Sequence, residues 1–302
     1  MNHVEKWFFF FVPPVTVVNC LMQVIAVNIS DNDFCQLRDF IYAACGIFFQ
    51  VNKKYFLENR VSRRMAALQF VTPGDYIGLL RNGMKGREEL KRLLDEVTTN
   101  ETCFFRNPAQ LKAFESHLLP EIIKIKEKVS FRKLRIWSAG SSSGEEAYTL
   151  AMLLLENRST LLKNWTFEIV GTDINERIIA QAREGIYSSY SVRNVPAPYL
   201  QKYFTKNAEQ FILAPEIRKS VAFSNLNLYD DSKMLFMRTF DVIICANVLI
   251  YFDAGAKSKI VQHFYNNLQP YGYFFVGQAE SLHGVNDRFK PIHFPGGFAY
   301  SK

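Results

Sequence analysis

The hydrophobic positions divide the chain into two parts with different periodicities. Over residues 31–95, apolar residues recur every three or four positions, and turn signals such as Thr72-Pro73-Gly74 and Asn82-Gly83 separate the runs. This pattern predicts a small all-α domain. After Phe131, short apolar runs alternate with amphipathic ones, which predicts an α/β domain with a mostly parallel, doubly wound sheet that helices cover on both faces.

The α/β part divides further into individual elements. Strands are expected over residues 134–139, 167–172, 221–224, 240–246 and 273–277, and helices over 145–155, 175–183 and about 257–268. Residues 185–220 interrupt this alternation with three prolines and short polar pieces, so we interpret them as an insertion.

The first thirty residues form an apolar extension whose order the sequence leaves open. Residues 7–27 carry no charge and are long enough to cross a bilayer. Pro13-Pro14 within this run, the polar residues Thr16, Asn19 and Gln23, and the lack of a basic flanking cluster argue against a membrane anchor. An anchor is the less favoured alternative.

Composition and charge narrow the class of protein. With 48% hydrophobic and 22% charged residues over 302 positions, the chain is neither disordered nor fibrous. Its 36 basic and 29 acidic residues give a net charge of +7, which suits a nucleic acid, an anionic membrane or an acidic protein. The five cysteines include no CxxC pair and the five histidines show no metal-ligand spacing, so we expect a cytoplasmic protein without a metal.

One predicted helix carries both an apolar and a basic stripe. Leu57, Val61, Met65 and Leu68 recur at helical spacing and predict a buried face. A single acidic residue, Glu58, stands among five basic ones, which are Lys53, Lys54, Arg60, Arg63 and Arg64. An ordinary solvated surface would account for them, but the imbalance also indicates docking of an acidic partner.

The segment WSAGSSSGEE at residues 137–146 is the strongest local indication of chemistry. It lies between a predicted strand and a predicted helix, where Gly140 and Gly144 permit a sharp turn and a close approach to a ligand. No Gly-Lys-Ser/Thr follows and the GxGxxG pattern is absent, so a phosphate clamp is not indicated. Because Glu145 and Glu146 would repel a pyrophosphate, a cationic ligand with a ribose fits better.

Polar residues also follow the next strands. Asp173 ends the strand expected over 167–172, at the position where a doubly wound sheet binds a ribose diol or an amino group. Asn247 follows the strand expected over 240–246. Together with the glycine turn, these residues describe a crevice for a nucleoside without a phosphate anchor, and S-adenosylmethionine is the common ligand of that description.

Several segments together resemble a known family. TTNETCFFR (98–106), WSAGSSSGEE (137–146), CANVLIYFD (245–253) and GQAES (277–281) look like the signatures of the chemotaxis receptor methyltransferases, the CheR family. NKKYFLENRVSRR (52–64) is similar to the basic helix of the family's N-terminal domain. The resemblance implies an all-α domain over 31–95 and a Rossmann-like, S-adenosylmethionine-dependent methyltransferase domain over 96–302, with a small inserted β-subdomain at about 185–220.

The resemblance also implies a role for each matching residue. Arg106 and Tyr251 would face the methyl-transfer centre as catalytic residues. Asn100, Thr102, Arg106 and Gly140 would line the pocket, Glu146 and Asp173 would hold the amino-acid or ribose part of the cofactor, Asn227 and Leu228 would lie near the adenine, and Asn247 and Val248 would lie beneath the sulfonium.

The reaction implied by the resemblance converts receptor glutamates to methyl esters and releases S-adenosylhomocysteine. The partner would be the acidic, helical cytoplasmic region of methyl-accepting chemotaxis receptors, and no nucleic acid is expected. The enzyme would be a cytoplasmic monomer that associates with membrane receptors. Residues 205–214 lack the glycine of family members that bind a receptor-tail peptide, so recognition without such a tether is expected.

The chain also departs from the family pattern. Family members usually have Cys and Thr at Ser141 and Ser143, Pro at Ala147, Arg at Ala246 and Ser at Ala279. Because Ala246 stands where family members have a cation, one alternative function is a non-catalytic module that binds S-adenosylmethionine or a receptor. The basic charge leaves a methyltransferase acting on RNA as another, although no binding element with interleaved basic and aromatic residues supports it.

Overall fold

The computed structural model describes residues 28–237, 239–295 and 297–302. The expectation about a membrane anchor falls on residues 7–27 and lies outside the described residues. Within the described ranges, no helix has both the length and the apolar character needed to cross a membrane.

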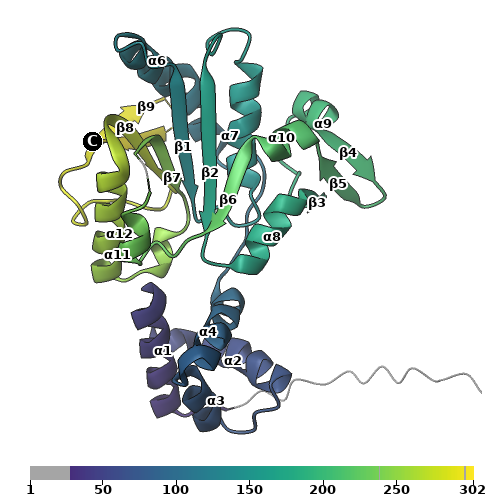
Figure 1. Ribbon diagram of the computed structural model, residues 1–302, viewed down its shortest axis with the longest axis vertical. Helices are drawn as coiled ribbons and strands as arrows, with labels where there is room; N and C mark the ends of the chain where they lie inside the picture. The colour runs from purple at the N-terminus through teal and green to yellow at the C-terminus, as the bar shows by residue number, and fades with distance from the viewer. Residues whose placement is uncertain (1–27, 238, 296) are drawn as a thin grey trace, which may run out of the picture.

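The N-terminal domain is a cluster of helices (Figure 1). It comprises α1 (Asp31–Cys45), the short 3-10 turn η1 (Val51–Lys53), α2 (Lys54–Ala67), α3 (Pro73–Leu80) and α4 (Gly83–Val97). Leu57, Val61 and Met65 are fully buried, which confirms the apolar face predicted for α2. The prediction is wrong for Leu68, which follows the end of α2 and is 39% exposed.

The second domain is built on a sheet that has seven strands in the described part of the chain. The strand order is β6-β2-β1-β7-β8-β10-β9. The parallel strands are β1 (Lys133–Ala139), β2 (Thr166–Asp173), β6 (Val221–Asn225), β7 (Phe240–Cys245) and β8 (Leu268–Val276), whereas β9 (Lys290–Phe294) and β10 (Gly297–Ser301) form an antiparallel edge.

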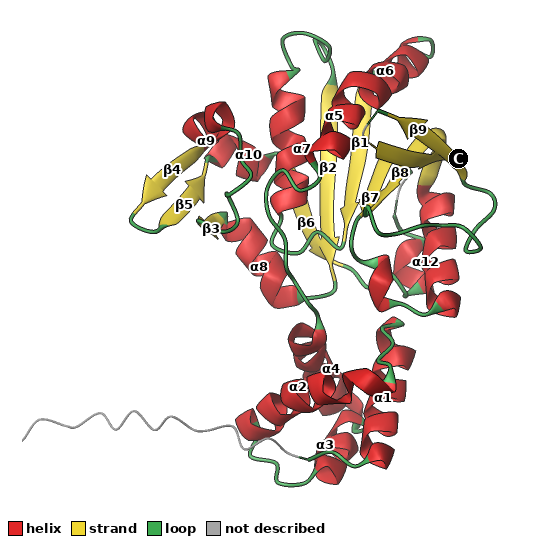
Figure 2. Cartoon of the chain, turned by 180° about the vertical axis from the view of Figure 1, so that it is seen from behind, coloured by secondary structure: helices red, strands yellow, loops and turns green. Residues whose placement is uncertain are grey.

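Helices cover both faces of this sheet (Figures 1 and 2). One face packs against α6 (Leu119–Glu127) and α7 (Glu145–Glu156), and the opposite face packs against α12 (Ala254–Asn267). Consecutive strand residues serve the two cores alternately, as Ile136 and Trp137 do in β1. Further helical segments are α5 (Pro108–Ala113), η2 (Phe114–Leu118), α8 (Glu176–Glu184), α11 (Asp231–Met234) and η3 (Leu249–Tyr251).

The predicted strands and helices of the α/β part are confirmed, with differences at some ends. β8 begins at Leu268, five residues before the expected start at residue 273, and passes through Pro270 and Gly272, two residue types that are normally rare inside a strand. The pairing of β7 with β8 is irregular in this region, between Phe240 and Val242, and such an irregularity tolerates a proline. The edge strands β9 and β10 were not predicted, because their residues lack a clear alternating pattern.

The insertion forms a subdomain of its own (Figure 2). Among its described residues, three antiparallel strands pair in the order β3 (Ile186–Ser188), β5 (Gln210–Leu213) and β4 (Phe204–Asn207). The short helices α9 (Ala197–Tyr203) and α10 (Pro215–Lys219) complete it. A small β-containing insertion at residues 185–220 is therefore present, as expected.

The helical domain lies beneath the carboxyl ends of the parallel strands (Figure 1). The Asn227 Nδ2 atom donates to the Ala44 carbonyl oxygen (2.8 Å), and Ile47 forms an isolated antiparallel bridge with Phe252. On the other side, the Asn175 Nδ2 atom donates to the Asp95 carbonyl oxygen (3.0 Å). These contacts fix the two domains around the edge of the sheet where the sequence places its candidate site.

Candidate active site

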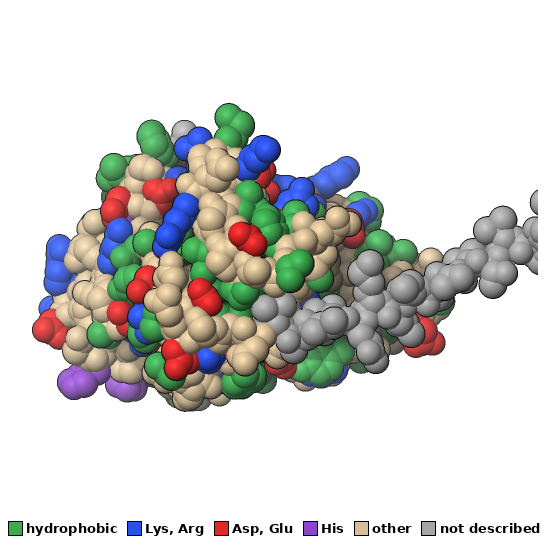
Figure 3. Space-filling model, turned by 90° about the horizontal axis from the view of Figure 1, so that it is seen from below, with side chains coloured by type: hydrophobic (Ala, Val, Ile, Leu, Met, Phe, Trp, Pro, Cys, Tyr) green, Lys and Arg blue, Asp and Glu red, His purple; other side chains and the backbone are tan. Residues whose placement is uncertain are grey.

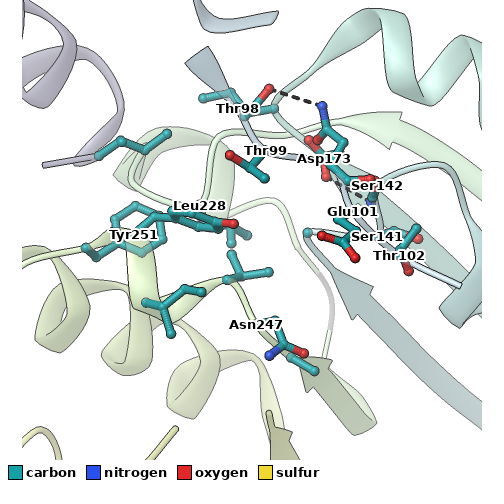
Figure 4. Close-up of a pocket in the computed structure, with 18 of the residues that line it drawn as sticks. Thr98, Thr99, Glu101, Thr102, Ser141, Ser142, Asp173, Leu228, Asn247 and Tyr251 are labelled. Atoms are coloured by element: carbon teal, nitrogen blue, oxygen red, sulfur yellow. Dashed lines mark hydrogen bonds between the residues drawn. The ribbon is translucent and has the colours of Figure 1, made fainter. Parts of the chain in front are cut away.

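A cavity of about 900 Å³ lies between the two domains, at the carboxyl ends of the parallel strands. Its volume falls at the upper end of the range for small-molecule sites, about 300–1,000 Å³. Figure 4 shows Asp173 and Ser142 on one side of it and Leu228 and Tyr251 on the opposite side. The residues expected at the cofactor and catalytic site all line it, namely Asn100, Thr102, Arg106, Gly140, Glu146, Asp173, Asn227, Leu228, Asn247, Val248 and Tyr251.

The glycine turn after β1 shapes one wall. Gly140 and Gly144 have φ angles of +73° and +93°, which glycine adopts without strain. A Cβ atom on Gly140 would lie 2.5 Å from the Val248 side chain. Any other residue at Gly140 would therefore displace Val248 from the cavity wall.

Asp173 is held rigidly at the end of β2. It is buried, its Oδ2 atom accepts from the Ser142 backbone N–H (2.9 Å), and its Oδ1 atom accepts from the Asn175 backbone N–H (3.0 Å). Burial raises the pKa of Asp173, and these backbone donors oppose the shift. Each carboxylate oxygen retains a lone pair that a ribose hydroxyl could use.

Glu146 places a second carboxyl group in the cavity. The Ser138 hydroxyl donates to it at 2.7 Å. Burial raises the pKa of Glu146 to about 7, while the hydrogen bond from Ser138 and the charge of Arg106 act in the opposite direction. A cationic ligand beside Glu146 would stabilise the ionised form, so this wall suits a sulfonium or an ammonium group.

Asn247 lies on a strained loop that Glu280 braces. Asn247 has a φ angle of +62°, and its backbone N–H donates to the Glu280 Oε2 atom at 2.7 Å. The same carboxylate accepts from the backbone N–H groups of Gly277 (2.7 Å) and Ile250 (3.1 Å). Sequence reasoning noted the segment 277–281 but missed this role of Glu280. Its signal was an acidic residue four positions after the end of a buried strand.

The residues present fit a polar ligand at this loop. Within the described chain, the buried Asn247 Oδ1 atom has no hydrogen-bond partner, and such an atom normally finds one. The side chain of Asn227 is different, because its Nδ2 donates to Ala44 and its Oδ1 accepts from the Tyr229 backbone N–H (3.0 Å). Asn227 therefore lines the cavity, but both polar atoms of its side chain are already engaged.

Arg106 and Tyr251 enter the cavity from different segments of the chain. Arg106 donates to the Glu101 carbonyl oxygen (3.1 Å). The hydroxyl of Tyr251 has no hydrogen-bond partner within the described residues, whereas its carbonyl oxygen accepts from the Phe48 backbone N–H (3.1 Å). The guanidinium and the free hydroxyl are both donors that suit an incoming carboxylate.

The five basic residues near α2 have different environments. Arg64 pairs with Glu89 through two hydrogen bonds (2.9 and 2.8 Å), and both side chains are nearly buried. The expectation that Arg64 is free to dock a partner is therefore corrected. Lys54 pairs with Asp31 (2.7 Å) and Arg63 lies 3.6 Å from Glu96.

The remaining two basic residues lack a carboxylate partner. Within the described chain, Lys53 and Arg60 form no ion pair. Lys53 lines the cavity, and Arg60 lies over the ring of Phe56, 4.8 Å from its centroid. Seen from the side of the N-terminal domain, acidic and basic side chains are interspersed (Figure 3).

The fold and the cavity define the class of the protein. A doubly wound sheet with a glycine turn after its first strand and an acid after its second binds nucleoside-containing ligands at the carboxyl ends of the strands. The chain belongs to the CheR methyltransferase family. Residues 100–298 match the family model "CheR methyltransferase, SAM binding domain", and residues 32–98 match "CheR methyltransferase, all-alpha domain". Its cofactor is S-adenosylmethionine.

Curated relatives are similar along almost the whole chain. Chemotaxis protein methyltransferase 2 of Vibrio cholerae serotype O1 is 36% identical over 277 residues, which cover 91% of this chain and 94% of the relative. The chemotaxis protein methyltransferase of Borreliella burgdorferi is 33% identical, with 85% and 91% covered. Chemotaxis protein methyltransferase 1 of Pseudomonas aeruginosa is 32% identical, with 91% and 99% covered.

Proposed function

We propose that this protein methylates the side-chain carboxylates of glutamates in the acidic, helical cytoplasmic region of chemotaxis receptors. The products are a glutamate methyl ester and S-adenosylhomocysteine. The observation that carries this proposal is that one cavity is lined by both acidic and basic side chains. The carboxyl groups of Glu146 and Asp173 are half-buried and buried, whereas the cations Arg106 and Lys53 are exposed to solvent. The two carboxyl groups suit a cationic cofactor, and the exposed cations suit an anionic acceptor.

The acceptor carboxylate needs no general base. A glutamate has a reference pKa of about 4.3, so at neutral pH it is already the anionic nucleophile. Bound S-adenosylmethionine supplies the methyl group at its sulfonium. The protein contributes by aligning the carboxylate with that methyl group and by excluding water, since the displacement removes opposite charges.

Five polar side chains of the cavity have a part in this arrangement. Arg106 and Tyr251 donate hydrogen bonds to the acceptor carboxylate and fix its approach. Asn247 donates and accepts through its side-chain amide near the cationic centre, and Asp173 accepts from the ribose. Glu146 balances the positive charge of the cofactor.

Basic residues of η1 and α2 recruit the receptor. Lys53, Arg60 and Arg63 attract the acidic helical region, while Arg64 acts within the N-terminal domain. The protein is proposed to work as a monomer in the cytoplasm and to reach receptors in the membrane. Recognition does not require a receptor-tail peptide, because the turn between β4 and β5 is short and lacks glycine.

Transfer of a radiolabelled methyl group to receptor-containing membranes tests this function. Base-labile label on receptor glutamates is the expected result. Label on RNA, or binding of S-adenosylhomocysteine without turnover on any receptor, would contradict the proposal. The latter result would also make Ala246, which lines the cavity, the first position to restore to arginine.

A further inference from the structure

Two large apolar side chains remain exposed at the cavity although a hydrophobic core lies beside each of them. Phe48, in the segment between α1 and η1, is 39% exposed, and Ile250, in η3, is 54% exposed. Both line the cavity. Exposed apolar side chains that gather at the mouth of a site, unlike ones scattered singly, indicate contact with a partner.

These two side chains are held in place through the backbone. The Ile250 N–H donates to the buried carboxylate of Glu280 (3.1 Å), and the Phe48 N–H donates to the carbonyl oxygen of Tyr251 (3.1 Å). The ring of Phe48 also packs edge-on against Tyr42, with 6.0 Å between the centroids. Phe48 and Ile250 therefore flank Tyr251 from the two domains, next to the proposed methyl-transfer centre.

Unpaired positive charge lies beside this apolar surface. Lys53 lines the same cavity and forms no ion pair within the described chain, and neither does Arg60, which lies over the cavity-lining ring of Phe56. A cationic and apolar mouth is complementary to an acidic helix with an apolar position next to the reacting glutamate. On a helix, side chains three or four residues apart lie about 5–6 Å from each other on one face.

We propose that Phe48 and Ile250 form an apolar rim that selects the acceptor. The rim contacts an apolar side chain located one helical turn from the glutamate to be methylated, on the same face of the receptor helix. Glutamates with a polar neighbour there are methylated poorly, since burying that neighbour against the rim removes its contact with water. This inference rests on the proposed function and adds which glutamates are chosen.

The test compares rim variants on matched receptor acceptors. Phe48→Ser and Ile250→Ser are assayed for methyl-ester formation on a receptor glutamate with an apolar residue one turn away, and on the same receptor with that residue changed to Ser. With the apolar neighbour, kcat/KM is expected to fall roughly tenfold in each rim variant. Changing the neighbouring receptor residue to Ser is expected to lower the methylation rate of the wild-type enzyme. In the rim variants the same receptor change should cause little further loss of rate, because the contact it removes is already absent.

Three controls separate recognition from folding. S-adenosylhomocysteine affinity, measured by calorimetry, stays unchanged in the rim variants, and Ile250→Val retains most of the rate. Val129→Ser removes an apolar side chain that is 68% exposed, more than either rim residue, and that lies just before β1 at the opposite end of the sheet. This substitution leaves the rate unchanged. If the rim variants fold poorly, the rates of the wild-type enzyme on the apolar-neighbour and Ser-neighbour receptors still test whether an apolar neighbour is required.

Two results would overturn the inference. One is an equal rate of wild-type enzyme on apolar-neighbour and Ser-neighbour acceptors. The other is a rate loss in the rim variants that is the same for both acceptors. A wild-type enzyme that labels no receptor glutamate would instead contradict the proposed function itself, so the two failures are distinguishable.

Discussion

The Tyr42 hydroxyl donates a hydrogen bond to the Asp253 carboxylate, 3.1 Å from its Oδ2 atom, and so joins residues that are 211 positions apart. Tyr42 belongs to α1 of the helical domain. Asp253 lines the cavity and caps α12 by accepting from the Ala256 backbone N–H (2.8 Å). One carboxylate thus holds the helical domain, the cavity and a helix of the α/β domain together.

Removing this bond is expected to loosen the junction between the domains. Tyr42→Phe loses one hydrogen bond and should lower the free energy of unfolding by about 1 kcal/mol. Asp253→Ala also loses the cap of α12 and should lower it by about 2 kcal/mol. Urea unfolding measures both values. Equal stability of the two variants would contradict the double role of Asp253.

Cofactor binding is expected to depend on pH through Glu146. Its pKa is raised to about 7 by burial, and the cationic cofactor binds best when the group is ionised. S-adenosylmethionine affinity should therefore fall as pH decreases from 8 to 6. Glu146→Gln should bind more weakly and lose this pH dependence. Calorimetry at several pH values measures both, with Glu145→Gln as a control, because Glu145 lies outside the cavity lining.

Glu146 is also expected to make the stability of the folded protein depend on pH. The pKa of Glu146 in the folded protein lies above its ordinary value of 4.5, so the folded state binds the proton more tightly than the unfolded state does. The stability contributed by this proton is complete below pH 4.5 and is lost as pH rises through about 7. At pH 8, Glu146→Gln is therefore expected to unfold at a temperature no lower than the wild type. A large fall in melting temperature would show that the ionised group stabilises the fold.

Glu280 is expected to be needed for the shape of the site. Glu280→Ala leaves the backbone N–H groups of Asn247, Ile250 and Gly277 without their acceptor. We expect a loss of about 3 kcal/mol in unfolding free energy and weaker binding of S-adenosylhomocysteine. Glu280→Gln, which keeps one acceptor oxygen, should be intermediate. Cofactor affinity that is unchanged in Glu280→Ala would mean that the loop keeps its shape without this brace.

Substitutions of the basic residues near α2 are expected to affect either stability or receptor binding, depending on the residue. Arg64→Ala breaks a mostly buried pair with Glu89 and should cost about 2 kcal/mol of stability. Lys53→Glu and Arg60→Glu should leave stability and cofactor affinity intact, raise KM for the receptor and weaken its salt dependence. Lys124→Glu is the matched control, since it changes net charge equally on an exposed position of α6. A similar rise in KM for Lys124→Glu would indicate a general charge effect.

Arg106 is expected to position the acceptor carboxylate. Arg106→Ala should lower kcat/KM for the receptor on the order of a hundredfold, because the carboxylate loses its fixed orientation. Arg106→Lys keeps the charge near Glu146 but lacks the planar guanidinium, so cofactor affinity should remain near wild type while turnover falls. Full turnover with unchanged KM in Arg106→Ala would refute the assignment.

The sequence by itself determined the order of the elements and the positions of the ligand-facing turns. The spacing of hydrophobic residues and the residue types that form turns depend only on neighbours within a few positions. The glycine turn at Gly140 and the acidic residue Asp173 could therefore be placed at strand ends from the sequence. Parallel strands then bring those ends to one edge of the sheet. Local signals were weaker where pairing decides the structure, as in β8 across Pro270 and in the edge strands β9 and β10.

Only the tertiary structure decided which charged groups are available and which are not. Arg64 looks like its neighbours in the sequence, but Glu89, 25 positions away, takes up its charge. The brace at Glu280, the raised pKa of Glu146 and the approach of Phe48 to Tyr251 likewise arise from contacts between distant segments. Burial and pairing are properties of the folded surroundings, and no local pattern of residues encodes them.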